Sequence, residues 1–282
     1  MTVLLAVALG LLIGLSLGAL GGGGSILTLP ALVYALGETA QTATTGSLVI
    51  VGITAAAAAV GHARARRVRW RAGVAFGAAG VAASLVGTHL NARVQPGVLL
   101  VAFAVLMLIA AGAMLAKTMV RSSPDEDEAD QQAGALPRPA QTGTTAQAGP
   151  GVPRAGTTVR NALPVLAAGL VVGFLTGFLG VGGGFIIVPA LVLTLKYDMP
   201  TAVGTSLVVI SLNSAVALLA RGGQERFDWA VIVPFTLAAI AGSGAGKKVA
   251  DRMSVPHLTR GFAVLLLLVA GYVLLQAALT ST

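Results

Sequence analysis

Two runs of glycine are the residues of this sequence whose type and spacing could do chemistry. Four of the five residues from Gly21 to Ser25 are glycine, and the run from Gly180 to Gly184 is interrupted only by Val181. Such a run breaks a helix, because each glycine costs about 1 kcal/mol relative to alanine in a helix interior and permits positive φ. A half-helix that begins after the break would present free N–H groups and a positive dipole end, which suit an anion.

Hydroxyl and amide side chains near the start of two later apolar segments form a second candidate group. Thr44 and Thr45 could cap their own helix or donate hydrogen bonds to an anion. Asn213 lies deeper in an apolar segment and must find a partner, either on a neighbouring helix or on a substrate. The predicted substrate-binding residues are Gly21, Gly22, Gly23, Gly24, Ser25, Thr45, Ser47, Gly180, Gly182, Gly183, Gly184, Thr205, Ser206 and Asn213.

Close helix packing is the alternative interpretation of the glycine runs. Spaced small residues serve that purpose in membrane helices, and we expect it of Gly14 with Gly18 and of Gly173 with Gly177. Packing alone would not need a consecutive run, so a binding site is favoured. A nucleotide-binding loop is disfavoured, because no strand is expected before the glycines and no Gly-Lys-Ser/Thr follows them.

Side chains for acid–base or metal chemistry are scarce. The chain has no cysteine, and its three histidines stand far apart at positions 62, 89 and 257. We expect all ten acidic residues to lie in loops or at the ends of apolar segments, which leaves no intramembrane carboxylate for a proton or cation relay. The sequence therefore predicts no catalytic residues, no metal site and no cofactor, and it argues against an enzyme.

The elements that must position these residues are membrane helices. Of the 282 residues, 56% are hydrophobic and 10% are charged, whereas soluble domains carry about 25% charged residues. Apolar stretches such as 98–115, 203–220 and 262–279 approach the roughly 20 residues that span a bilayer. The net charge of +8 lies mainly between such stretches, which is typical of cytoplasmic loops and does not indicate nucleic-acid binding.

The chain repeats itself. A shift of 159 residues, from 70 to 229, superimposes Trp70 on Trp229 and also aligns Pro30 with Pro189. Between the copies, an acidic run and a mixture of Gly, Pro, Ala, Thr and Gln have too little apolar surface to order themselves. The predicted organisation is a first transmembrane repeat at 1–119, a flexible cytoplasmic linker at 120–160 and a second transmembrane repeat at 161–282.

Each repeat is expected to contain five helical segments, so the fold class is an all-α polytopic membrane protein. The second segment of each repeat, 25–37 or 184–196, is short for a span, and whether it crosses the membrane stays open. If both cross, the repeats are inverted, and all the basic residues except Arg93, Arg221 and Arg226 lie on one side. Re-entrant short segments would sort the charges less well, so the inverted arrangement is favoured. The expected segments are 2–20, 25–37, 42–60, 72–90 and 97–118, then 161–180, 184–196, 201–219, 229–246 and 256–278.

The paired glycine motifs carry a family resemblance. The sequence from Gly14 through Gly21–Ser25 to Leu29-Pro30-Ala31-Leu32-Val33, its second copy from Gly177, and the following Ala202–Leu207 resemble the TauE/SafE family of bacterial sulfite and organosulfonate exporters. The resemblance covers nearly the whole chain outside the linker. It implies a multi-pass transporter in the bacterial plasma membrane, and the sulfur chemistry of the substrate comes from the resemblance alone.

The function expected from these observations is secondary transport of a small anion, with sulfite, a sulfonate or a related sulfur oxyanion as substrate. Two repeats would give alternating access to a site between them. Two alternatives stay open: a transporter of another small solute or a metal cation, and a membrane scaffold that transports nothing. The expected partners are the substrate and the lipid bilayer. Small residues on exposed helix faces would also allow a homodimer.

Overall fold

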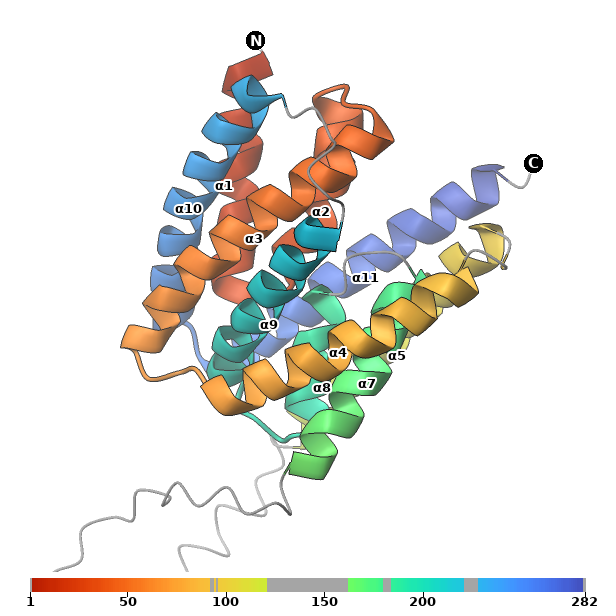
Figure 1. Cartoon of the computed structure of the whole chain (residues 1–282). Helices are drawn as coiled ribbons and strands as arrows, with labels where there is room; N and C mark the ends of the chain where they lie inside the picture. Colours follow the sequence, from red (N-terminus) through yellow and green to blue (C-terminus); the bar gives the residue numbers. More distant parts are fainter. Residues whose placement is uncertain are drawn as a thin grey trace, which may run out of the picture.

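A computed structural model of the chain describes residues 2–91, 94, 96–120, 162–179, 184–220 and 228–280, and every element in them is a helix. This confirms the all-α class, while the predicted linker beyond Val120 lies outside the described residues. The first half contains α1 (Thr2–Leu20), α2 (Gly23–Pro30), the π-helical turn η1 (Ala31–Ala35), α3 (Ala40–Arg64), α4 (Trp70–Asn91) and α5 (Pro96–Val120). The second half contains α7 (Ala162–Leu179), α8 (Gly184–Leu193), α9 (Met199–Ala220), α10 (Trp229–Arg252) and α11 (Val255–Thr280) (Figure 1).

The helices are long and apolar enough for a multi-pass membrane protein. Within the described residues, six helices could each cross a bilayer by length and composition: α1, α3, α4, α9, α10 and α11. The apolar parts of the other helices are shorter, and among these the helical segment Gly23–Ala35 and α8 correspond to the two short segments expected from the sequence. Large apolar side chains such as Leu4, Leu163 and Leu219 are exposed on the outside, where lipid would cover them.

The two halves contact each other reciprocally. The first helix of each half packs on the fourth helix of the other, so α1 pairs with α10 and α7 pairs with α4. The remaining helices pack on their own counterparts: α2 on α8, α3 on α9 and α5 on α11. Exchanging the halves therefore leaves the contact pattern unchanged. A two-fold relation between the repeats would produce this pattern.

Glycines bring the outer helix pairs close together. A Cβ atom on Gly14 would overlap the backbone of Ala239, and one on Gly173 would overlap the backbone of Gly80, which is the equivalent position in the other half. Gly18 and Gly177 likewise lie against the backbones of Ser243 and Ser84. The packing role expected for these four glycines is confirmed.

The helix contacts also bear on the directions in which the two halves run. Along α1, Gly10, Gly14 and Gly18 meet successively later residues of α10, so the two helices run parallel. The first residues of α1 and the last residues of α11 lie at one end of the molecule, whereas α7 begins at the other end (Figure 1). This arrangement supports an inverted repeat, whose orientation in a membrane stays a prediction.

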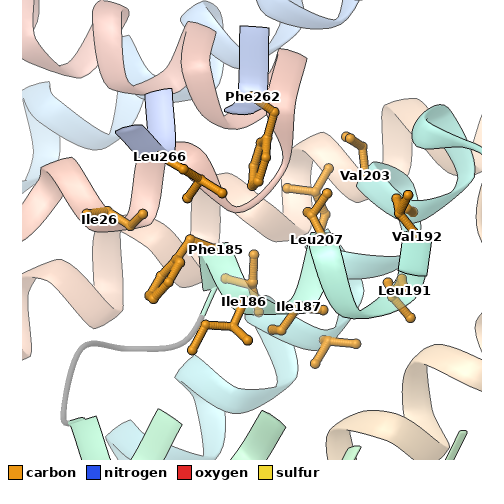
Figure 2. Close-up of a cluster of buried hydrophobic side chains, with 14 of the residues drawn as sticks. Ile26, Phe185, Ile186, Ile187, Leu191, Val192, Val203, Leu207, Phe262 and Leu266 are labelled. Atoms are coloured by element: carbon orange, nitrogen blue, oxygen red, sulfur yellow. The ribbon is translucent and has the colours of Figure 1, made fainter. Parts of the chain in front are cut away.

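The main apolar core surrounds α8. Side chains of α8, α9 and α11 and Ile26 of α2 converge there (Figure 2). Phe185 is fully buried and makes an edge-to-face contact with Phe103 of α5, with ring centroids 5.1 Å apart. The starts of the two short helices are thus held in apolar surroundings.

Candidate functional site

The short helices α2 and α8 begin against each other at the centre of the molecule. A Cβ atom on Gly22 would overlap the carbonyl group of Gly184, and one on Gly184 would overlap the hydroxyl of Ser25. Ser25 and Gly184 are equivalent positions of the two repeats. The first glycine motif therefore contacts Gly184, the described residue of the second motif, at the point that the two-fold relation would leave in place.

The helix break is narrower than the sequence suggests. Only Gly21 and Gly22 lie outside a helix in the first motif, because Gly23, Gly24 and Ser25 already form the first turn of α2. Gly21 has a φ of +73°, which disfavours any other residue, and its N–H donates to the carbonyl of Leu17 at 2.8 Å. The expected helical segment 25–37 thus begins two residues earlier than predicted, since a helix tolerates glycine in its first turn.

Gly23 and Gly24 pack on other helices. A Cβ on Gly24 would press on the backbone of Ile13 and the side chain of Leu17 in α1. A Cβ on Gly23 would overlap the flexible end of Leu265 in α11 and would also crowd the hydroxyl of Ser16 in α1. These two glycines thus serve packing of α2. Gly180, Gly182 and Gly183 of the second motif, which the sequence predicts to bind substrate, lie outside the described residues.

The start of α2 is buried and no described side chain caps it. The first residue before the helix is Gly22, and Gly21 to Gly24 are all buried. A helix leaves its first N–H groups without intrahelical partners, and a buried start without a cap calls for another acceptor. With α8 starting beside it, two positive helix ends meet in an apolar environment. Such an arrangement can hold a small anion by its oxygens.

Two serine hydroxyls border this meeting point. Ser25 Oγ donates to the carbonyl of Gly22 at 2.7 Å, and Ser206 Oγ in α9 donates to the carbonyl of Val203 at 2.8 Å. Ser206 also lies against Gly21, where a Cβ would stand 2.7 Å from its oxygen. A hydroxyl can rotate to donate to an oxyanion instead. The structure thus brings Gly21, Gly22, Ser25, Gly184 and Ser206 together.

The hydroxyls of the long helices lie further inside those helices than predicted. Thr39 caps α3, with Thr42 N–H donating to its oxygen at 3.3 Å, so the expectation that Thr44 and Thr45 sit at a helix start was wrong. Thr45 is buried in the second turn, and Ser47 Oγ donates to the carbonyl of Thr44 at 2.8 Å. In α9, Thr205 accepts from the N–H of Arg69 at 3.2 Å, which ties it to the loop between α3 and α4.

Asn213 has an equivalent that the sequence reasoning missed. Its Oδ1 and the Oγ1 of Thr54 are buried atoms that have no hydrogen-bond partner among the described residues. The repeat places Thr54 at the same position of α3 as Asn213 in α9, and these helices pack on each other. The repeat shift could have pointed to Thr54. Buried polar atoms without partners are costly, and a bound ligand would satisfy them.

The acidic residues lie where the sequence places them, as far as they are described. Asp198 accepts from Thr201 N–H just before α9, and Asp228 caps α10 by accepting from Ala230 N–H at 3.0 Å. Asp251 stands in the last turn of α10 and forms ion pairs with Arg67 and Lys247. Within the described part of the chain, no cluster of His, Asp or Glu could hold a metal ion.

Comparisons with known proteins agree with this architecture. The family described as "Sulfite exporter TauE/SafE" matches residues 6–273. A "Probable membrane transporter protein" of Xylella fastidiosa (strain 9a5c) is 30% identical over 276 residues, which cover 97% of this chain and 95% of the relative. A probable membrane transporter protein of Bacillus subtilis (strain 168) is 23% identical over 276 residues, which cover 95% of this chain and 96% of the relative.

A more distant relative is a probable membrane transporter protein of Methanocaldococcus jannaschii, 24% identical over 90% of this chain and 88% of its own. No solved structure matches the chain. The family match covers the chain almost from end to end, and the six candidate spans agree with a multi-pass protein of a bacterial inner membrane. The chain therefore belongs to the TauE/SafE family and is a membrane transporter.

Proposed function

We propose that this transporter moves a small oxyanion, namely sulfite, a sulfonate or a related sulfur oxyanion, through a site at the meeting point of α2 and α8. The observation that carries the proposal is the buried, uncapped start of α2 against the start of α8, with the hydroxyls of Ser25 and Ser206 beside it. The three oxygens of a sulfite or sulfonate group accept hydrogen bonds from N–H and O–H groups in several directions, so this donor set suits them. The sulfur is suggested by the family description alone.

The two-fold packing of the halves supports alternating access as the transport mechanism. A site between two symmetry-related units can open to either side if the units rock against each other. The close glycine contacts of α1 with α10 and of α4 with α7 each join helices from different halves. Rocking would therefore move these pairs as rigid units about the central helices.

Flux measurements in proteoliposomes test the proposal. The purified chain should move radiolabelled sulfite or a sulfonate such as methanesulfonate faster than empty liposomes, and unlabelled oxyanions should compete whereas divalent cations should not. Competition by cations would favour the alternative of cation transport. Absence of flux for every oxyanion, from protein that is folded and correctly reconstituted, would overturn the proposal and favour a scaffold.

A further inference from the structure

His62 is a buried titratable side chain that the oxyanion site does not use. It lies in the last turn of α3, and 1% of its surface is exposed. Its Nε2 stands 3.2 Å from the carbonyl oxygen of Gly18 in α1. A carbonyl only accepts, so Nε2 carries the hydrogen of this bond.

The other ring nitrogen of His62 is left without a partner. Nδ1 is buried, and no described residue forms a hydrogen bond with it. With the hydrogen on Nε2, the neutral ring presents a bare acceptor at Nδ1. Most buried polar atoms in proteins have a partner, because an unpaired one costs about 1–3 kcal/mol. This atom is free to bind a proton.

The ring sits beside the oxyanion site. Gly18 precedes Gly21 by one helical turn in the segment that leads to the helix break. A Cβ on Gly204 of α9 would stand 3.1 Å from the Cβ of His62, and Ser206 follows two residues later. His62 therefore contacts both segments that carry the glycine and serine donors.

The charged groups around His62 belong to α10 and to the loop between α3 and α4. Lys247 and Asp251 of α10 and Arg67 of the loop between α3 and α4 face it, and Asp251 is paired with both cations. Neither α1 nor α9, which also pack on His62, contains a charged residue. Asp251 is the one carboxylate near His62 among the described residues and is already engaged, so a proton on Nδ1 would add a positive charge to this region. Its charge could be balanced by an anion in the site.

The repeat aligns His62 with a basic residue in the sequence. The equivalent residue of the second half is Arg221, which is permanently charged and lies outside the described residues. One half thus carries a fixed positive charge and the other carries a titratable one. The titratable member can make anion affinity depend on protonation.

We propose that His62 Nδ1 is the proton-binding site that couples oxyanion movement to proton movement, so that one proton and one anion bind together. The inference rests on the proposed anion transport. An N–H bond forms at Nδ1 with a proton from water, and the bond breaks when the anion leaves, so the ring returns to its neutral form. Because the coupling is reciprocal, protonation raises anion affinity by the factor by which the anion raises proton affinity. Transport then follows the combined gradients of proton and anion.

The test uses fluxes into proteoliposomes that contain the full-length chain. The pH dependence is measured with methanesulfonate, because sulfite itself binds a proton in this pH range, and sulfite flux at one fixed pH reports only whether oxyanions are transported. Lowering the outer pH from about 8 to about 5 extends well below the titration midpoint of an ordinary histidine and should raise wild-type uptake at least about fivefold. His62→Gln keeps a donor for the Gly18 carbonyl but binds no proton, so its uptake should lose this dependence and stay at the high-pH rate. His257→Gln, at an exposed ring bonded to Ser254, should behave like wild type.

A second measurement does not need transport. Methanesulfonate does not titrate in this range, so calorimetric binding in buffers of different ionisation enthalpy reports protons taken up by the protein. The wild type should take up about one proton per anion near neutral pH, and His62→Gln should take up none. His62→Arg should bind the anion with little pH dependence.

The outcomes separate this inference from the proposed function. Flux that does not respond to pH, or a His62→Gln variant that keeps the full response and the proton uptake, would overturn the role of His62 and leave anion transport intact. No flux of either anion by wild-type protein would instead overturn the transport proposal itself.

Discussion

Glycine is used differently at the outer helix pairs and at the centre of this protein. In the pairs α1–α10 and α4–α7, glycines recur every four residues within continuous helices and let two backbones touch. At the centre, Gly21 and Gly22 separate α1 from α2, and the two short helices α2 and α8 start against each other. The outer contact creates no unpaired polar group, whereas the central one gathers N–H groups and hydroxyls in an apolar surrounding. Glycine thus allows rigid helix packing in the outer pairs, whereas at the centre it leaves hydrogen-bond donors available to a ligand.

The largest effect that would test this comparison is expected in the outer pairs. Gly14→Leu or Gly173→Leu should prevent recovery of folded protein, because the new side chain would overlap backbone and must separate two helices, at a cost of about 3 kcal/mol or more. Yield and thermal unfolding in detergent measure this. Gly112→Ala and Gly271→Ala occupy equivalent positions with open space and should unfold at the wild-type temperature or above. Normal stability of Gly14→Leu would contradict a rigid frame.

A smaller loss of stability, but a large loss of flux, is expected at the centre. In Gly22→Ala the Cβ would overlap the Gly184 carbonyl, which should displace the starts of α2 and α8 at a cost of about 1–3 kcal/mol. We expect oxyanion flux per folded molecule to fall about tenfold or more. In the control Gly46→Ala, the Cβ makes an ordinary contact with Ile232 and flux should persist. Equal flux in the two variants would contradict a role of the central glycines in transport.

Serine hydroxyls allow a finer comparison, because four of them bond to their own helix in the same way. Ser25 and Ser206 lie at the centre, and Ser84 and Ser243 lie on the outer pairs. Replacing either central serine by alanine should raise the KM for the oxyanion about fivefold, which corresponds to one hydrogen bond of about 1 kcal/mol. The outer replacements should leave KM within twofold. A uniform effect across all four would mean that the hydroxyls serve only the helices.

The smallest expected effect concerns stability alone. Thr54→Val removes a buried oxygen that has no partner among the described residues, so it should leave the unfolding temperature unchanged or raise stability by up to about 1 kcal/mol. Thr176→Val, on the outer helix α7, removes a hydroxyl that donates to the Val172 carbonyl and should give no gain. A clear loss of stability in Thr54→Val would show that its oxygen is satisfied in the folded protein.

The sequence predicted the all-α class, because apolar length leaves a local pattern. The duplication and the pairing of the glycine motifs stay predictions, with which the reciprocal helix contacts and the contact of Gly22 with Gly184 agree. The sequence did not predict where the helix break ends. Gly23 and Gly24 adopt the helical conformation, which is open to glycine but is not favoured by it. The sequence reasoning also missed Thr39 as the cap of α3. His62 gave no signal, because its burial depends on contacts with Gly18 and Gly204, which are distant in the sequence.

The exchange of partners between halves has a consequence for synthesis of the chain in the cell. The principal partner of α1 is α10, which begins only at Trp229, and the partner of α4 is α7, across the linker. The glycine face of α1 therefore stays uncovered in the bilayer until most of the polypeptide has left the ribosome. Neither half has a complete packing surface by itself, so assembly is a late, whole-chain event. Truncation before α10 would leave the glycine face of α1 without its packing partner.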